Sequence, residues 1–362
     1  MSKNMPEERK IFILVFILVL SGLFILFNAS SFVASQLSQC SNDPFYYVLK
    51  QFRSIIIGVT ILFFLYKWRL ENLKKIAFPG LLLSIILLIL VLAVGKEING
   101  AKRWLNLKFM NFQPSEMAEF FLLVYISAFI SSYKSFNKSH SKIIGLLLIC
   151  SLVIGLVAIE PNFSTAALMF VFVLALLLIS DIPKGYIISM TSVILTGGVI
   201  YMFKYSHAMS RIKMLIGSIE SEQTENSILA IANGGFFGEG IGMGKFKLFF
   251  IPEVHSDFIF TTIAEEMGFV GCMLLIGLFL LFLRIGIAVA KNSYNSFHKA
   301  LAYGATVMIF TKAIVHMTIS LKILPATGLV LPFISYGGTA MIFNLAMVGI
   351  LMNIARENRL GK

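Results

Sequence analysis

Several ionisable side chains lie in one short stretch that leads into a long apolar segment. The stretch runs from Ile251 to Phe260 and contains Glu253, His255 and Asp257. The chain has only three Asp residues, and Asp257 alone lies directly beside a long hydrophobic run. A carboxylate held at a boundary between water and an apolar medium has a raised pKa, which suits it to take a proton from a hydroxyl group. Asp257 is therefore predicted to act as a general base.

Two other interpretations of this stretch are open. Ser and Asp are favoured N-cap residues, so Ser256 or Asp257 would then serve only to begin the next helix. Glu253, His255 and Asp257 also alternate along the chain. On an extended strand these three side chains would face one side, as ligands of a metal ion do, although the spacing matches no established zinc pattern.

Glu265 and Glu266 follow about two helical turns inside the apolar segment. An unpaired carboxylate is costly inside a membrane, so both side chains are expected to have partners within the protein. A structural ion pair with Lys312 or Arg284 would meet this need.

A second group of polar residues precedes another apolar run. Glu116 is expected in the first turn of a helix, where the helix dipole favours an anion, and Pro114 suits the first helical position, with Gln113 as a candidate cap. These roles are a sufficient structural explanation. The functional interpretation is that Lys102, Arg103 and Glu116 contribute to an outward-facing polar cavity.

A third group lies between Leu324 and Thr339, where two prolines and three glycines interrupt a hydrophobic stretch. Irregular backbone at membrane depth is tolerated only where protein covers it or where it lines a cavity. Packing explains the glycines, whereas Ser335, Tyr336 and Thr339 together predict a polar-lined cavity.

Six glycines lie between Gly234 and Gly244, so the backbone there must turn tightly or approach another segment closely. No strand precedes them, and a dinucleotide-binding loop is therefore not favoured. The same connecting segment contains two predicted short helices, Ile212 to Ile219 and Ser227 to Ala232, and the cations Arg211, Lys245 and Lys247. Cations in this segment would suit a substrate that bears a pyrophosphate group.

Membrane-spanning helices must position these residues. Hydrophobic residues make up 58% of the chain and charged residues 13%, and the mean hydropathy is +0.87, which excludes an ordinary soluble domain of 362 residues. We predict an all-α polytopic membrane protein, because apolar runs of about 20 residues recur along the chain. The ten predicted spans are Ile11 to Ala34, Val48 to Tyr66, Ile76 to Gly95, Pro114 to Ser132, Ile143 to Ile159, Thr165 to Ser180, Ile187 to Phe203, Phe258 to Leu283, Ala300 to Ser320 and Leu331 to Ile354.

The distribution of Lys and Arg predicts how these spans are oriented. The termini and the short loops on their side carry 17 basic residues, and the opposite short loops carry seven. Positive residues favour the cytoplasmic side, so both termini are predicted to be cytoplasmic. The long connection over residues 204–257 then faces outwards and holds Asp257, within a single membrane domain over residues 1–362. Most of the net charge of +12 follows from this bias, with attraction to anionic lipids as a further effect, and no nucleic-acid partner is expected.

Six motifs, in this order and spacing, resemble the signatures of the SEDS family (shape, elongation, division and sporulation). They are Gly100-Ala-Lys-Arg-Trp104, Gln113-Pro-Ser-Glu116, Gly234-Gly-Phe-Phe-Gly-Glu-Gly240, Pro252-Glu-Val-His-Ser-Asp-Phe-Ile-Phe260, Glu265-Glu-Met-Gly268 and Leu331-Pro-Phe-Ile-Ser-Tyr-Gly-Gly338. Residues 240–245, 42–45 and 28–31 resemble the division type more than the elongation type.

The resemblance implies a ten-helix peptidoglycan glycosyltransferase of the bacterial cytoplasmic membrane that polymerises lipid II and works with a class B penicillin-binding protein. Other membrane proteins of division or elongation complexes, and membrane lipids, are further expected partners. The family's essential aspartate corresponds to Asp257. No cofactor is required by the sequence, and a Mg²⁺ or Mn²⁺ ion with Glu253 or Asp257 as ligand is an additional expectation. Candidate substrate-binding residues are Lys102, Arg103, Glu116, Arg211, Lys245, Lys247, Glu253, His255, Ser335 and Tyr336.

The chain departs from the family pattern mildly at His255-Ser256, where His-Thr is commoner, and more strongly in two other places. A Ser-Glu-x-x-Lys run is here Ser115-Glu-Met-Ala-Glu119, and a Pro-Asp-x-Gly run is here Pro161-Asn-Phe-Ser164. The first change replaces a carboxylate and lysine pair by two carboxylates, which puts the usual ion pair in doubt, and the second removes a charge.

Two functions of other classes compete with the enzyme. A flippase for a lipid-linked precursor would use ionisable groups spaced across the membrane, such as Glu265, Glu266 and Lys312. A non-catalytic scaffold would activate a penicillin-binding protein through helix contacts. Neither function needs the carboxylate of Asp257.

Overall fold

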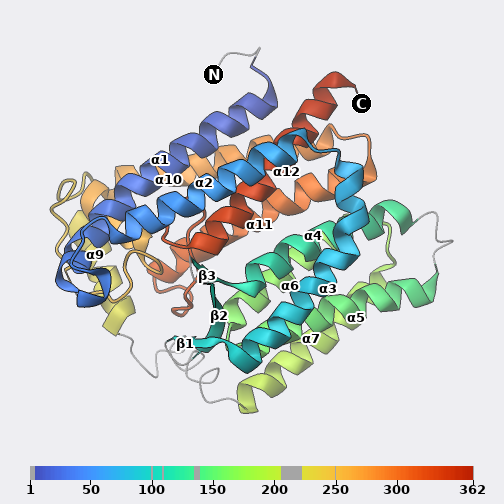
Figure 1. Ribbon diagram of the computed structural model, residues 1–362, viewed down its shortest axis with the longest axis horizontal. Coiled ribbons are helices and arrows are strands. Elements are labelled where there is room, and N and C mark those ends of the chain that lie inside the picture. Colours follow the sequence, from blue (N-terminus) through green and yellow to red (C-terminus); the bar gives the residue numbers. More distant parts are fainter. Residues whose placement is uncertain are drawn as a thin grey trace.

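The computed structural model describes residues 5–98, 101–107, 110–133, 139–204, 222–248 and 250–361. Long helices lie alongside one another, and the two ends of the chain lie at the same end of the bundle (Figure 1). The helices are α1 (Glu7–Gln36), α2 (Tyr46–Lys67), α3 (Leu70–Val94), α4 (Pro114–Ser132), α5 (His140–Ile159), α6 (Phe163–Leu178), α7 (Lys184–Lys204), α9 (Glu222–Gly234), α10 (Ile259–Lys291), α11 (Ser296–Ser320) and α12 (Gly338–Leu360), with a short 3₁₀ helix η1 (Ser38–Cys40).

Eight helices of the described residues are long and apolar enough to cross a membrane. Their outer faces carry large apolar side chains, for example Phe16, Phe64 and Leu148, which are 53%, 58% and 65% exposed. Water would solvate such a surface poorly, whereas lipid tails solvate it well. The all-α polytopic fold class is therefore confirmed.

Each of the ten predicted spans overlaps one helix, and the limits agree fully only for Pro114–Ser132. Two of these helices are shorter apolar helices, Phe163–Leu178 and Lys184–Ile200, so a count of ten crossings remains a proposal. The predicted start of the last span at Leu331 is wrong, since α12 begins at Gly338 and the residues before it are irregular. Pro332, with no N–H to donate, and the paired Gly337 and Gly338 disfavour an earlier helix start.

The last helix, α12, is the centre of the bundle. It is buried along most of its length and packs against α1, α2, α4, α10 and α11. Figure 1 shows α12 between α2 and α11. Its hydropathy is lower than that of the lipid-facing α1 and α3, because a helix surrounded by protein can keep polar residues that have partners. Asn353 is one of these, and its side chain donates to the carbonyls of Leu65 and Trp68 at 2.7 and 2.6 Å.

A small antiparallel sheet lies between α3 and α4, where only a loop was expected. Its strands are β1 (Lys96–Ile98), β2 (Ala101–Leu107) and β3 (Met110–Phe112), with β2 in the middle. Lys96 pairs with Trp104, and Leu105 pairs with Phe112. Because neighbouring residues of a strand face opposite sides, the sheet separates the side chains of Lys102 and Arg103.

The long connection before α10 is partly ordered by hydrogen bonds to that helix. It contains α9, which covers the predicted short helix at Ser227–Ala232, and then a glycine-rich strap over residues 235–248. Glu239 and Gly240 donate main-chain bonds to the carbonyls of Glu265 and Glu266 at 2.9 and 3.1 Å. A second predicted short helix, residues 212–219, lies outside the described residues.

The strap requires a break in α10. Gly268 has a φ of +62°, which ends the first part of the helix. Beyond the break, Phe269 and Val270 donate to the carbonyls of Gly235 and Phe236. A Cβ at Gly268 would lie 2.4 Å from the nitrogen of Gly238, so only glycine fits where the two segments meet.

Candidate active site

Asp257 lies at the end of a turn, two residues before α10 begins. The main-chain N–H groups of Ser256 and Asp257 both donate to the carbonyl of Glu253 at 3.0 Å. The N-cap of α10 is Phe258, and no side chain caps this helix. The interpretation of Ser256 or Asp257 as a helix cap is therefore wrong, and the carboxylate of Asp257 is left for another role.

The segment before α12 holds this turn in place. Ser335 donates its hydroxyl to the carbonyl of Ser256 at 2.7 Å, and the N–H of Tyr336 donates to the carbonyl of His255 at 3.0 Å. The hydroxyl of Thr339 bonds within the protein too, with the carbonyl of Asn111. These hydroxyl groups lock segments together, so the prediction that Ser335 and Thr339 line a polar cavity is not supported.

Helix α2 fixes the same segment from the other side. Gln51, which is 1% exposed, donates to the carbonyl of Ser335 at 3.0 Å and accepts from the N–H of Gly337 at 3.1 Å. One turn earlier, the ring of Tyr47 lies 4.1 Å from that of His255 and 5.1 Å from that of Tyr336. A polar residue inside an otherwise apolar helix was the available sequence signal for Gln51.

Arg103 reaches the site from β2. Its Nε donates to the carbonyl of Glu160 at 3.2 Å, and its Nη2 donates to the carbonyl of Pro161. A Cβ built on Gly328 would lie 3.4 Å from Asp257 Oδ2 and 3.9 Å from Arg103 Nη1. The guanidinium group and the carboxylate therefore flank the same glycine, and the structure brings these two predicted site residues together. Lys102 is exposed on the opposite face of β2.

The surroundings of Asp257 make its carboxylate more basic than usual. Burial, with a smaller effect of Glu253, raises its pKa to about 6, although Ser256 and Arg103 act in the opposite direction. At neutral pH the group is mostly ionised and yet has a useful affinity for a proton. This is the property that general base catalysis requires.

The neighbouring groups titrate far from neutrality. Burial lowers the pKa of His255 to about 4, so this imidazole is neutral at pH 7. Burial raises the pKa of Tyr336 to about 12, with smaller effects of Tyr46, Cys40 and Glu253. Asp257 is therefore the better candidate for a base that works near neutral pH.

Glu253, His255 and Asp257 do not lie on an extended strand. Glu253 has a φ of +54° inside the turn, and its carboxylate lies 3.4 Å from His255 Nε2, while Asp257 lies beside Arg103. The described part of the chain contains no group of three acidic, His or Cys side chains placed to hold a metal ion. The alternating-ligand hypothesis is therefore wrong in its geometry.

Glu116 is used inside the bundle. Lys312 Nζ lies 2.9 Å from Glu116 Oε2 and 2.5 Å from Glu119 Oε2, and all three side chains are buried. The expectation that Glu116 lines an outward cavity is wrong. The main chain of Gln113 donates to Thr339 Oγ1 at 3.1 Å, and its side chain does not cap α4.

The carboxylates of Glu265 and Glu266 hold the glycine-rich strap. Glu265 accepts the N–H groups of Lys245 and Phe246 at 2.6 and 3.3 Å. Lys247 Nζ donates to Glu266 at 2.6 Å and to Asn28 Oδ1 at 2.8 Å. The suggested partners Lys312 and Arg284 are therefore wrong.

These contacts also separate the candidate cations of the strap. Lys247 is 6% exposed and its ammonium group also donates to the carbonyl of Gly242. It is a structural cation, and its predicted contact with substrate is not supported. Lys245 keeps an exposed side chain. Arg211 lies outside the described residues.

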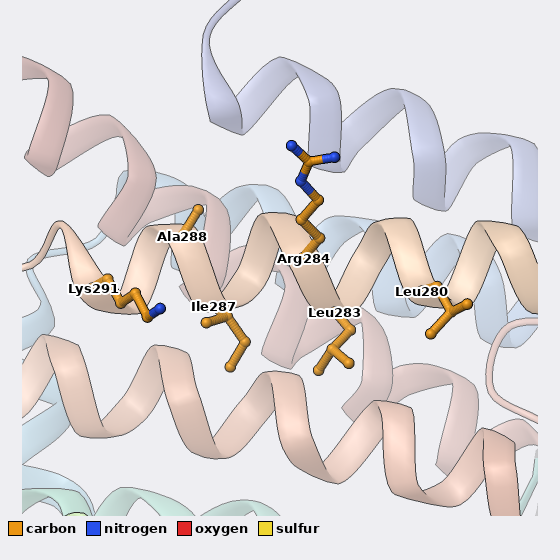
Figure 2. Close-up of a pocket in the computed structure, with 6 residues that line it drawn as sticks. All are labelled: Leu280, Leu283, Arg284, Ile287, Ala288 and Lys291. Carbon is orange, nitrogen blue, oxygen red and sulfur yellow. The ribbon is translucent and has the colours of Figure 1, made fainter.

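A groove of about 430 Å³ lies far along α10 from Asp257. Figure 2 shows its lining residues, which all belong to α10. Arg284 follows Asp257 by 27 residues, which corresponds to about 40 Å along a helix. The groove therefore lies near the opposite end of α10. Its lining residues are Leu280, Leu283, Arg284, Ile287, Ala288 and Lys291.

Two further residues of the site, besides Gln51, were not anticipated. Glu160 is fully buried beside Arg103, and Gly328 lies between Arg103 and Asp257 with a φ of +70°. A single acidic residue at the end of an apolar run was the available signal for Glu160. No sequence signal separated Gly328 from the neighbouring glycines.

Fold and site together define a polytopic α-helical membrane protein. At one end of the bundle it places an arginine beside an aspartate whose pKa is raised. The chain belongs to the family described as "Cell cycle protein", which comprises FtsW, RodA and SpoVE, since the family model matches residues 8–360. The predicted resemblance to the SEDS family is thereby confirmed.

Curated relatives cover nearly the whole chain. A probable peptidoglycan glycosyltransferase FtsW of Geobacter sp. (strain M18) is 32% identical over 95% of this chain and 95% of its own length. A protein of the same name from Haemophilus influenzae is 30% identical over 98% of this chain and 91% of its own. These names agree with the predicted resemblance to the division type.

Solved structures share the fold. A chain from a structure described as "Structural coordination of polymerization and crosslinking by a peptidoglycan synthase complex" has a TM-score of 0.76 and 24% identity, over 96% of this chain and 97% of that one. The rod shape determining protein RodA of Thermus thermophilus has a TM-score of 0.71 and 25% identity, over 96% of both chains.

Proposed function

We propose that the chain is a peptidoglycan glycosyltransferase that polymerises lipid II at the outer face of the bacterial cytoplasmic membrane, for septal wall synthesis in cell division. The names of its curated relatives support the activity. One observation carries the proposal: the carboxylate of Asp257, with a pKa of about 6, lies beside Gly328, and the guanidinium group of Arg103 lies beside the same glycine.

Asp257 is the general base in this proposal. A sugar hydroxyl of the acceptor attacks the anomeric carbon of the donor, and a new glycosidic C–O bond forms. The bond between that carbon and the lipid pyrophosphate breaks, and the leaving group takes the electron pair. Asp257 accepts the hydroxyl proton, a contribution of about a hundred to ten thousand fold.

Arg103 acts on the other side of the reaction. Negative charge develops on the departing pyrophosphate, and a fixed guanidinium group stabilises it without having to reorganise. Two main-chain carbonyls already orient Arg103. The exposed Lys102 and Lys245 are candidates for weaker contacts with the phosphates or with lipid head groups.

A divalent cation is an additional proposal. Mg²⁺ or Mn²⁺ carried by the pyrophosphate oxygens would take a further oxygen ligand from Asp257 or Glu253, since hard cations prefer such ligands. Polymerisation with EDTA, and with EDTA followed by each metal, tests this dependence.

The arrangement in the membrane and the partners belong to the same proposal. Ten crossings with cytoplasmic termini would put Asp257 outside, where lipid II is used. A class B penicillin-binding protein would supply the transpeptidase, and the likeness to a chain of a peptidoglycan synthase complex supports such a partner. Other division proteins and membrane lipids complete the proposed surroundings.

Polymerisation of lipid II tests the proposal directly. The purified chain with its candidate class B partner and a transpeptidase inhibitor should yield glycan ladders on a gel. Asp257→Asn should abolish the ladders. Asp43→Asn is a matched control, because the carboxylate of Asp43 accepts a bond from the N–H of Phe45 in its own turn. Equal ladders from Asp257→Asn and wild type, with the partner alone inactive, would reject Asp257 as the base.

Transport and scaffolding predict other results. The flippase hypothesis used Glu265, Glu266 and Lys312, and these groups are held in fixed bonds to the strap and to α4. A fluorescent lipid II analogue that crosses vesicles containing the chain would favour transport. Unchanged activation of the partner by Asp257→Asn, without ladders from wild type, would favour a scaffold.

A further inference from the structure

We propose that Glu160 is a positioning residue that acts through Arg103: its buried carboxyl group decides how much of the guanidinium charge is available to Asp257 and to the pyrophosphate of the substrate. This inference rests on the proposed function. It concerns a carboxyl group that the mechanism above does not use.

The position of Glu160 is unusual for an acidic residue. It ends α5, it is 0% exposed, and neither of its carboxyl oxygens has a hydrogen-bond partner among the described residues. A buried ionised carboxylate without such partners is costly. The neutral, protonated form is therefore favoured at this place.

Arg103 connects this carboxyl group with the site. The guanidinium group is held by the main-chain carbonyls of Glu160 and Pro161, and its Nη1 lies on the side of Gly328 and Asp257. Its charge favours the ionised forms of both Glu160 and Asp257. Two carboxyl groups therefore depend on one cation.

Within the part of the chain that the structure describes, no charged group other than Arg103 is found to act on Glu160. Asn162, at the start of α6, accepts a bond of 2.8 Å from Thr165, and both residues are buried. Asn162 stands where the family pattern has an aspartate, so this position adds no charge beside Glu160 in this chain. Among the described residues, Arg103 is the charged group that acts on Glu160.

The two carboxyl groups titrate on either side of neutrality. Burial raises the pKa of Glu160 to about 8 in spite of Arg103, whereas that of Asp257 is about 6. Between these values Asp257 is ionised and Glu160 is neutral, so Arg103 keeps most of its charge for the substrate. Above about pH 8 Glu160 ionises, Arg103 faces two carboxylates, and its attraction for pyrophosphate falls.

The pH dependence of lipid II polymerisation tests this role. In wild type, kcat/KM should rise through about pH 6 and fall above about pH 8. The fall above pH 8 should come from an increase in KM and not from a decrease in kcat. Glu160→Gln imitates the neutral carboxyl group. At pH 7 we expect the kcat/KM of this variant to lie within about twofold of the wild-type value. Above about pH 8 the wild-type value should fall by about tenfold per pH unit, and the variant should not show this alkaline fall. Glu119→Gln, which changes another buried carboxyl group, should keep it.

A second measurement needs no substrate. Infrared titration of the purified chain should show a protonated carboxyl band that disappears near pH 8, is missing in Glu160→Gln, and persists to higher pH in Arg103→Gln, because Arg103 lowers the pKa of Glu160. An alkaline fall unchanged in Glu160→Gln, or a band unaffected by Arg103→Gln, would overturn the proposal. Absence of ladders from wild type, with the band behaving as expected, would instead reject only the proposed polymerase function.

Discussion

The hydroxyl of Ser335 donates a hydrogen bond of 2.7 Å to the carbonyl of Ser256, the residue immediately before Asp257. The two serines are 79 positions apart in the chain. Gln51 binds the carbonyl of Ser335 from α2, so three segments meet directly behind the carboxylate. These bonds therefore hold in place the backbone that carries Asp257.

Ser335→Ala should reduce polymerisation much more than it reduces stability. Loss of the bond leaves the carbonyl of Ser256 unpaired at a cost of about 1–3 kcal/mol, and a displacement of Asp257 by about 1 Å would lower the rate by about a hundredfold. Ladder formation and the thermal midpoint in detergent check this. Ser127→Ala removes an equally buried hydroxyl that bonds only within α4, and it should leave the rate unchanged.

Gly328→Ala should inactivate the protein while leaving it folded. The φ of +70° costs a side chain about 1–2 kcal/mol, and the new methyl group would occupy the space between Asp257 Oδ2 and Arg103 Nη1. Gly235→Ala carries the same kind of strain, with a φ of +51° and nothing within 4 Å of the added carbon. We expect the two variants to have similar thermal midpoints and only Gly328→Ala to lose the ladders. Equal activity of the two variants would contradict the proposal that Asp257 and Arg103 act together beside Gly328.

The helices could be predicted from the sequence because a bilayer imposes a simple rule of length and hydrophobicity. Pro114–Ser132 has the predicted limits, as its proline and first-turn glutamate mark a helix start. The sheet over residues 96–112 could not be predicted, since β1 and β3 have only three residues each and the pairing of β1 with β2 shifts register between Lys96 and Glu97. Pairing between neighbouring backbones, rather than side-chain pattern, decides such a structure.

The onset of activity with pH should follow Asp257. Its raised pKa means that the folded protein holds the proton more tightly than the unfolded chain does, so ionisation costs stability as the pH rises from 3.8 to about 6. Activity should therefore appear as the pH passes about 6. Arg103→Gln should move this rise to higher pH, because Arg103 lowers the pKa of Asp257.

Stability gives an independent check of that sign. Above about pH 6, Asp257→Asn should unfold at the same temperature as wild type or a higher one, because the ionised carboxylate is the costly form. A clearly lower thermal midpoint would mean that ionised Asp257 stabilises the fold, which contradicts a raised pKa.

Lys312→Met should destabilise the bundle strongly. It would leave Glu116 and Glu119 buried beside each other without a cation, at a cost of about 3–5 kcal/mol. The double variant Lys312→Met, Glu119→Lys returns a cation to α4, one turn from Glu116, and should recover much of the thermal midpoint. Lys322→Met breaks an exposed pair with Glu225 at 3.6 Å. This variant should change the free energy of unfolding by less than about 1 kcal/mol.

Asp257 could be singled out from the sequence as the candidate base, whereas the partners of most charged residues could not be predicted. Asp257 was found because aspartates are scarce in the chain and this one lies beside an apolar run. Glu116 and Lys312 are 196 positions apart, and nothing in the local pattern of either residue points to the other. The strap contacts of Glu265 and Glu266 likewise depend on a loop conformation that glycine makes available without specifying it.

The central place of α12 has a consequence for biogenesis. This helix follows in the chain every helix that it packs against, namely α1, α2, α4, α10 and α11. During synthesis those helices enter the membrane before the helix that fills the space between them. The core is therefore closed only after the ribosome has translated Leu360, and until then a nascent chain must keep the inner faces of five helices covered by lipid, by an insertase or by one another.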